Sequence, residues 1–496
     1  MASIDDLPNV ILEYILGKVS PYGDIKACSM VCSRWHQCCQ RVAQVMKTRF
    51  QSAVLNGPLG MKIIPACPTS SFASSRMMQS ACVVESDLYL FGGCTSALTT
   101  FNDLWRINLQ SGKINLVHAI PTSTVPSPKS HLPLVSWNGH LILFGGWASP
   151  CPYPLHQSGI LFDELHCFNI DKNIWIPVDF PGKPPAVAGH TATVHGDVIV
   201  FFGGFQNNGQ GIHVSSNSVT CLDMKKGKWL KPRISYNSPP PRYGHSQFKL
   251  DEKHVIIMSG CGGYNDLHCD YWMLTIPSDI RSSESWEWRR LREEQSDYMP
   301  KKLWCSPSCQ VDDNIVVLSY ESHITSKVTL PAAGHVAAIG RVECTKAPMP
   351  EPPVVSHFKP SVRPNANNHR ELRKSLLDKH SIRLQLLSNS NAAQCVASPG
   401  SSQRIENVGY VKPSCRQGVY ILSLKNVLSD GVVRWLPGPT CCFDNDPPHP
   451  RLLSSLVLGK AELILCGGKK ARECDCDPDD PIPPIVYLRA TALPPP

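Results

Sequence analysis

The sequence predicts a mainly β fold, a six-bladed propeller that follows a small all-α domain. An apolar segment ending in a glycine doublet, first seen at residues 88–93, recurs along the chain at steps of 53, 58 and 56 residues. Such a period suits a unit of four strands. The 44 prolines and 33 glycines are typical of strands joined by turns and long loops. Units of this kind packed side by side form a propeller.

Each copy of the segment is expected to form the second strand of a blade. A continuous apolar run that ends in glycine is typical of a buried strand followed by a turn with positive φ. Tryptophans then mark the fourth strands of units two to five, at Trp175, Trp229, Trp288 and Trp435. In the fifth copy, Ser319-Tyr320 replaces the doublet while the period is kept. The six copies occupy residues 88–93, 141–146, 198–204, 255–260, 314–320 and 463–468.

The fifth unit is interrupted, because Trp435 lies 115 residues after Tyr320 whereas the corresponding distance in units two to four is 25 to 29. Residues 325–415 are rich in Pro, Ser, Asn and basic side chains, a composition typical of disorder. Residues 369–387 could form a transient helix. We expect a solvated linker, and a docking or phosphorylation segment is the alternative.

The sixth unit ends before a fourth strand. A propeller removes its sheet edges by closing completely, so the missing strand is expected from the other end of the ring. We predict that a strand within residues 59–66, centred on residues 61–64, fills that place.

Helices are predicted before the propeller. Ile11, Leu12, Ile15 and Leu16 are spaced as on one helix behind Pro8, a residue suited to a first turn. Two further helical runs follow, and residues 41–55 continue as an amphipathic helix that would make a stiff connection. A unit of this size buries little core alone, so its exposed apolar residues should dock on a partner.

The N-terminal segment resembles the F-box, with Leu7-Pro8 at its start, an Ile-Leu repeat and Val31-Cys32-x-x-Trp35 at its end. Val10 departs from the pattern, which usually has an acidic residue there. The doublet-plus-tryptophan units resemble the Kelch repeat over most of residues 75–490, although the first unit lacks its tryptophan. Together these features resemble the F-box/Kelch proteins.

This resemblance implies a domain plan and a function. It implies binding of the adaptor Skp1 and, through it, of a cullin, so that the chain would be the substrate-recognition subunit of an SCF-type cullin-RING ubiquitin ligase, with no catalysis of its own. The expected domains are an F-box at 1–40, a helical linker at 41–58, the propeller from 59 to 324, the insertion at 325–415 and the end of the propeller at 416–493. The implied Skp1 contacts are Leu7, Pro8, Ile11, Leu12, Ile15, Leu16, Val31, Cys32 and Trp35.

A protein substrate is expected on one face of the propeller. Because each strand reverses direction, the loops after the second strands and those joining consecutive blades emerge on the same side. Binding residues concentrate on such loops, with aromatic and arginine side chains as the usual energetic centres. The predicted substrate contacts are Trp147, Tyr153, His156, Phe205, Arg242, Tyr243, Tyr264 and Arg451, with local packing as the alternative role of each.

Composition excludes some classes of protein. Residues 356–416 hold ten Lys and Arg against three Asp and Glu, so this segment carries most of the net charge of +8 and no nucleic-acid-binding face is implied. The start of the chain lacks the parts of a signal peptide, and no apolar run is long enough to span a membrane. We expect reduced cysteines and a soluble protein of the cytoplasm or nucleus.

Neither a cofactor nor a metal is expected. His131, His190 and His245 recur before the first strands of units two to four, and recurrence at a repeat position favours a structural hydrogen bond over catalysis. Cys474-x-Cys476 lacks a second pair at zinc-like spacing. Two rival functions stay open at this point: a Kelch scaffold without a ligase, and, with less support, a Kelch-type copper oxidase.

Overall fold

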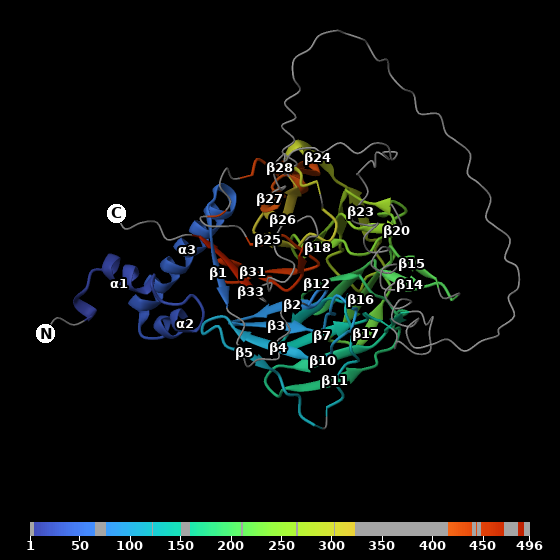
Figure 1. Ribbon diagram of the computed structural model, residues 1–496, viewed down its shortest axis with the longest axis horizontal. Coiled ribbons are helices and arrows are strands. Elements are labelled where there is room, and N and C mark those ends of the chain that lie inside the picture. Colours follow the sequence, from blue (N-terminus) through green and yellow to red (C-terminus); the bar gives the residue numbers. More distant parts are fainter. Residues whose placement is uncertain are drawn as a thin grey trace, which may run out of the picture. The chain divides into compact units, whose positions relative to one another are not determined.

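The computed structural model describes residues 4–64, 76–121, 123–149, 159–209, 212–263, 266–301, 303–322, 415–438, 443, 448–470 and 485–490. A helical domain comes first and six sheets follow it, in chain order around a ring (Figure 1). The predicted fold class is confirmed. The helical domain consists of η1 (Ile4–Asp6), α1 (Asn9–Leu16), α2 (Gly23–Ser29) and α3 (Ser33–Asn56).

The six blades are antiparallel sheets with the order expected of consecutive hairpins. In chain order, the blades contain β2 (Ser80–Val84), β3 (Asp87–Phe91), β4 (Leu104–Asn108) and β5 (Ile114–Leu116); β6 (Leu134–Trp137), β7 (His140–Phe144), β10 (Leu165–Asn169) and β11 (Ile174–Val178); β12 (Thr191–His195), β13 (Val198–Phe202), β16 (Val219–Asp223) and β17 (Lys228–Leu230); β18 (Ser246–Lys249), β19 (His254–Met258), β22 (Tyr271–Thr275) and β23 (Glu287–Arg290); β25 (Ser308–Val311), β26 (Asn314–Ser322), β27 (Cys415–Ser423) and β28 (Val432–Leu436); and β30 (Ser455–Leu458), β31 (Glu462–Cys466), β33 (Ile485–Ala490) and β1 (Leu59–Ile64).

The ring is closed by β1, as predicted. Residues Leu59 to Ile64 pair antiparallel with β33, from Leu59 opposite Ala490 to Ile64 opposite Ile485. This pairing supplies the sixth blade with the fourth strand that the C-terminal part of the chain lacks. The innermost strands also complete a circle, since β2, β6, β12, β18, β25 and β30 each contact the next and β30 contacts β2.

A belt of backbone hydrogen bonds surrounds the axis beside these inner strands. Two or three residues before each first strand, one residue has left-handed backbone geometry, with φ between 57° and 68°. The amide of one such residue donates to the carbonyl of its counterpart in the neighbouring blade, at 2.7 to 3.4 Å in five described cases. These bonds tie the blades together at one end of the axis. This axial belt consists of Met78, His131, Gly189, Gly244, Cys305 and Leu453.

The fifth blade shows where the insertion begins and ends. Strands β26 and β27 pair directly, from Asn314 opposite Ser423 to Ser322 opposite Cys415, so the sheet is complete without the residues between them. The expected disorder lies outside the described residues over 325–414, whereas Cys415 is the first residue of β27. One strand was not predicted: β24 (Arg292–Glu294) pairs parallel with β28 and gives this blade a fifth strand.

The four tryptophans expected on fourth strands lie there, on β11, β17, β23 and β28, and all are buried between blades. Short hairpins extend several loops beyond the sheets. The hairpins pair β8 (Trp147–Ala148) with β9 (Ile160–Leu161), β14 (Phe205–Asn207) with β15 (His213–Ser215), β20 (Cys261–Gly263) with β21 (Asp266–Leu267), and β29 (Arg451–Leu452) with β32 (Lys469–Lys470); η2 (Ser296–Tyr298) and α5 (Val427–Asp430) complete the described elements.

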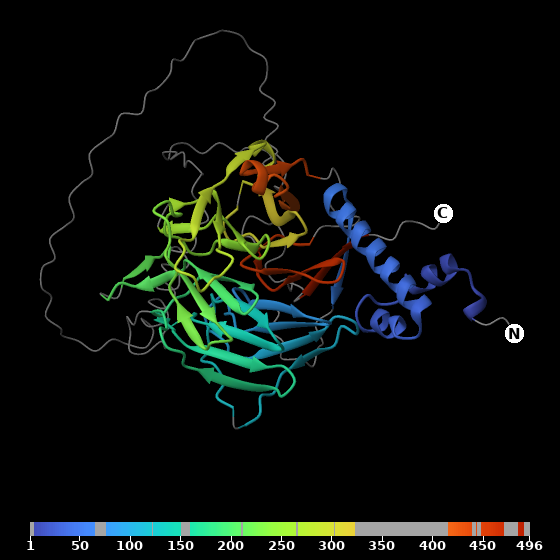
Figure 2. The ribbon, with the colours of Figure 1, turned by 180° about the vertical axis from the view of Figure 1, so that it is seen from behind.

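Helix α3 belongs to both parts of the molecule. Its first half packs Cys38, Cys39 and Val42 against α1 and α2. Its second half buries Phe50 and Val54 in a core cluster of the fifth and sixth blades. Figure 2 shows this helix beside the strands of the sixth blade, where it contacts β33. The expected boundary between residues 40 and 41 therefore lies inside one continuous helix. None of the helices in the described ranges is long and apolar enough to cross a membrane.

Replacing Leu59 by alanine tests the role of β1 in closure. The Leu59 side chain is buried in the cluster of the fifth and sixth blades. We expect the free energy of unfolding, measured by chemical denaturation, to fall by about 2–5 kcal/mol. The exposed Lys62 of the same strand is the control, and Lys62→Ala should change it by no more than about 0.5 kcal/mol. Equal effects of the two changes would show that β1 does not hold the ring.

Candidate functional site

The helical domain presents an exposed apolar surface, which we call the helical face. Its side chains come from two places, the outer side of α1 and the turn between α2 and α3. Exposed large apolar groups are informative when they gather, because isolated ones are common on any surface. This surface is formed by Val10, Ile11, Tyr14, Ile15, Met30 and Val31.

Two of the predicted Skp1 contacts are misplaced. Leu12 and Leu16 point to the opposite side of α1 from Ile11 and are fully buried against α3. They therefore stabilise the helical domain and are not available to a partner. The apolar pattern of α1 contains two rows, Ile11 with Ile15 and Leu12 with Leu16. Only the row of Leu12 and Leu16 faces the helical core.

The remaining predicted positions surround the helical face. Pro8 is exposed at the start of α1, and Cys32 is exposed just before α3. Leu7 is half-buried, and its carbonyl accepts a hydrogen bond from the Arg34 guanidinium. Trp35 is half-buried against the core of the helical domain. Ile11, Ile15 and Val31 are thus the predicted residues that are large, apolar and exposed in the helical domain.

Tyr22 joins the helical domain to the ring. Its side chain is 1% exposed, and its hydroxyl donates a hydrogen bond to the Glu462 carboxylate on β31. The same hydroxyl accepts from the Lys460 amide at 3.2 Å, and the Lys460 ammonium lies 5.6 Å from the ring centroid. Burial, with the Glu462 charge beside it, raises the pKa of Tyr22, so the hydroxyl keeps its proton.

The propeller loops meet on one side, as predicted. The residue after each glycine doublet forms a β-bridge with the residue that precedes the axial belt in the same blade, as in Ser130 with Trp147 and Ala188 with Phe205. The pairing of Tyr243 with Cys261 repeats it in the fourth blade. In these blades, the loop after the second strand is therefore hydrogen-bonded to the loop that leads into the first strand, so both loops lie on the same side.

An aromatic layer covers the axial belt on blades two to five. The rings of His131 and Trp147 lie 5.7 Å apart, those of His131 and Phe205 6.4 Å, and those of Phe205 and Tyr243 5.3 Å, all edge to face. Aromatic pairs favour this arrangement at such distances. A Cβ on belt residue Gly189 would stand 3.1 Å from the Phe205 ring. The layer consists of His131, Trp147, Phe205, Tyr243 and Trp304.

Trp304 was not predicted. It occupies the position of Tyr243 in the next blade, and a Cβ on Gly244 would stand 3.1 Å from its indole nitrogen. This buried N–H finds no hydrogen-bond acceptor within the described part of the chain. Trp304 directly precedes a residue of the axial belt, as Tyr243 does. The sequence alone does not reveal this equivalence, because the belt is recognisable only in the folded ring. His213, whose ring lies 5.4 Å from that of Phe205, was also not predicted.

Two predicted substrate contacts are wrong, because Arg242 and Arg451 are 0% and 1% exposed. Arg242 donates to Asp270 at 2.6 and 3.0 Å and to the Ser259 carbonyl at 2.8 Å. Arg451 donates to the Gly467 carbonyl at 3.2 Å, and burial lowers its pKa to about 10. Both guanidiniums are buried and join neighbouring loops by hydrogen bonds.

Equivalent ion pairs support the loops of other blades. Arg76 pairs with Asp103 in the first blade, and Lys129 pairs with Glu164 at 2.5 Å in the second. In each case a basic residue before the axial belt reaches an acidic residue before the third strand. Buried charges of this kind are retained when paired and hydrogen-bonded. Of the other predicted contacts, Trp147, Phe205 and Tyr243 come together in the aromatic layer, while Tyr153, His156 and Tyr264 lie outside the described residues.

Comparison with known proteins agrees with both halves of this architecture. A family model described as "F-box-like" matches residues 4–52, and one described as "FBX42, beta-propeller domain" matches residues 76–284. In both matched segments the chain is similar to the F-box/Kelch proteins. Its order of F-box, long loop after Gly146 and interrupted fifth blade resembles F-box only protein 42.

Similar proteins share only part of their length with this chain. An F-box/kelch-repeat protein of Arabidopsis thaliana is 29% identical over 177 residues, which cover 33% of this chain and 34% of the relative. Tip elongation aberrant protein 1 of Schizosaccharomyces pombe is 27% identical over 193 residues, covering 37% of this chain and 16% of the relative. The solved structure of YjhT has a TM-score of 0.47 at 11% identity and covers 83% of this chain and 95% of its own. The chain thus spans about a third or less of the curated relatives it matches.

The recurring histidines of the propeller pack as uncharged rings. Burial lowers the pKa of His131 to about 4, and that of His190 and His245 to about 3. His131 shares a hydrogen bond with Ser130 and His245 with Thr191, while the His190 ring lies against Phe144 and Phe201. Within the described ranges, no three His, Cys, Asp or Glu side chains are placed to hold a metal ion.

Buried histidines make the stability of the propeller depend on pH. Above the usual histidine pKa of about 6.5, folded and unfolded chains are both uncharged at His190, so its contribution is complete. Between about pH 6.5 and 3, only the unfolded chain binds the proton, and stability falls as pH falls. We expect His190→Gln to reduce this slope by up to about 1.4 kcal/mol per pH unit, measured by denaturation at pH 7 to 4. Equal slopes for His190→Gln and for the unaltered chain would contradict the assignment.

Proposed function

We propose that this F-box/Kelch protein is the substrate-recognition subunit of an SCF-type cullin-RING ubiquitin ligase. The F-box would bind Skp1 and, through it, a cullin, and the propeller would bind a protein substrate that is then ubiquitinated and degraded. The chain would work in the cytoplasm or nucleus, without a cofactor and without catalysing bond formation itself.

The observation that carries this proposal is the helical face. Its six apolar side chains are exposed and lie within the segment that matches the F-box-like family. Burying such a surface against a partner is strongly favourable, by about 25 cal/mol for each Å² of apolar area removed from water. The similarity of this segment to the F-box supports Skp1 as the partner.

The aromatic layer is the best candidate for the substrate surface. Trp147, Phe205 and Tyr243 are partly exposed on loops that the axial belt and the buried ion pairs hold in place. Rigid aromatic side chains lose little conformational entropy on binding, which makes them frequent energetic centres of interfaces. Substrate recognition would therefore concentrate near the propeller axis on blades two to five.

The mechanism requires no reacting group from this chain. A receptor that holds a substrate near a ubiquitin-charged enzyme raises the effective concentration of the substrate lysines. This increase in effective concentration depends on geometry, and it is lost if the bound substrate faces away from the ubiquitin-charged enzyme. Helix α3, which is shared by the F-box and the ring, provides a stiff connection between the two surfaces.

Charged substitutions on the helical face test the proposal. We expect Ile11→Asp combined with Ile15→Asp to weaken binding of purified Skp1 to the full chain by more than tenfold, because each carboxylate would be buried in an apolar interface. Isothermal titration calorimetry measures this affinity.

Two further variants separate binding from folding. Trp147→Ala, in the aromatic layer, should leave the Skp1 affinity unchanged. Leu12→Ala should lower the stability of the F-box without removing any contact surface. If the Ile11 and Ile15 changes leave Skp1 binding intact, or if the unaltered chain does not bind Skp1, the chain is a Kelch scaffold that works without a ligase.

A further inference from the structure

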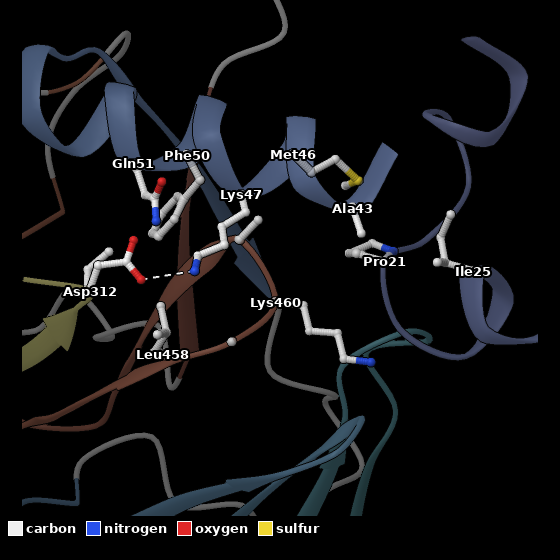
Figure 3. A pocket seen from close by; sticks show the side chains of 13 residues that line it. Pro21, Ile25, Ala43, Met46, Lys47, Phe50, Gln51, Asp312, Leu458 and Lys460 are labelled. Carbon is white, nitrogen blue, oxygen red and sulfur yellow. Dashed lines mark ion pairs between the residues drawn. The ribbon is translucent and has the colours of Figure 1, made fainter. Parts of the chain in front are cut away.

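The F-box and the ring meet along a seam that is packed at one end and open in the middle. Phe50 and Val54 fill the packed end. Beside them lies a hollow of about 270 Å³, with Ala43 and Met46 of α3 on one wall and Leu458 of the sixth blade on the other (Figure 3). Side chains that do not touch across a gap lose their dispersion contacts, so the hollow contributes nothing to holding the seam at a fixed angle.

Polar contacts lie on both sides of the hollow. Lys47 pairs with Asp312 at 3.0 Å, but these side chains are 56% and 43% exposed, and exposed ion pairs stabilise weakly. Figure 3 shows this pair near Phe50. Asp24 accepts a hydrogen bond from Gln110 at 2.5 Å, also in an exposed position. Neither exposed contact fixes the seam firmly.

Tyr22 makes a buried contact across the seam, and its ring packs among apolar residues of the first and sixth blades. Its hydroxyl meets Glu462, which is 1% exposed and also accepts a hydrogen bond from Arg489 on β33. Hydrogen bonds to a buried charged group are stronger than neutral or exposed ones. Glu462 lies on β31, which pairs with β33, and β33 pairs with β1. The contact of Tyr22 is therefore linked through the sixth blade to β1, the strand that follows α3.

We infer that Tyr22 is a positioning residue, whose hydrogen bond to Glu462 fixes the angle of the F-box on the propeller and thereby the direction in which a bound substrate faces. This inference rests on the proposed function for its consequence in ubiquitin transfer, but the fixed angle itself does not depend on it. Phe50 and Val54 anchor α3 at one point, and Tyr22 supplies the second point that prevents rotation about the first.

The angle can be measured directly in the full chain. Spin labels at exposed Gln37 and Lys228, attached to noncanonical amino acids because the chain has 22 cysteines, report the distance between F-box and third blade by electron double resonance. We expect one narrow distribution for the unaltered chain and at least a twofold broader one for Tyr22→Phe. Exposed Tyr236 is the matched control, and Tyr236→Phe should change nothing.

Two more variants distinguish loss of this hydrogen bond from a general loss of structure. Glu462→Gln removes the charged acceptor at nearly constant size and should broaden the distribution as Tyr22→Phe does. Adding Ala43→Leu to Tyr22→Phe places apolar atoms in the hollow and should narrow the distribution again. Distributions for Tyr22→Phe and Glu462→Gln as narrow as that of the unaltered chain would overturn the inference.

Ubiquitin transfer tests the consequence. In a ligase reconstituted with Skp1, cullin, RING subunit and charged conjugating enzyme, mass spectrometry maps which lysines of the chain itself receive ubiquitin. Tyr22→Phe should keep Skp1 affinity within twofold and spread modification over more lysines, with at least a threefold lower rate at the favoured ones. An unchanged pattern despite a broadened distance would overturn the positioning role. If no variant binds Skp1, the proposed function fails, and the distance measurement still decides whether Tyr22 fixes the angle.

Discussion

The structure depends on the antiparallel pairing of β1 with β33. This pairing joins the two ends of the described propeller, and it places the strand that continues from α3 inside the sixth blade. A sheet edge left open at this position would expose unpaired backbone groups over six residues. The same six residues therefore close the ring and attach the F-box to it.

Closure also determines what the loop side of the propeller can do. The axial belt joins the sixth blade to the first through the hydrogen bond that the Met78 amide donates to the Leu453 carbonyl. Trp147, Phe205, Tyr243 and their neighbours rest on that belt, and the buried ion pairs fix the loops around them. The ring thus fixes the backbone of the surface proposed for substrate binding. The side chains on that surface would determine which substrate it binds.

Sequence reasoning was most successful where a pattern repeats. The glycine doublets, the buried tryptophans and the missing fourth strand were enough to predict six blades and the closing strand, because each is a local consequence of blade geometry. It failed where a side chain's role depends on a partner distant in sequence. Arg242 is buried because Asp270 lies opposite it, and nothing in the sequence around Arg242 indicates that pairing. Trp304 was missed because its place is defined by the belt, which exists only in the folded ring.

The F-box and the propeller behave as one body in this account, since α3, β1 and Tyr22 each join them. Native-state hydrogen exchange of the full chain tests this most directly, because it gives the opening free energy of each part separately. We predict that amides of β1 and of the second half of α3 exchange with the same free energy as those of the inner strands β12 and β18. If β1 and α3 instead open at markedly lower free energy while the inner strands stay protected, the F-box is only loosely attached to the ring and the account is contradicted.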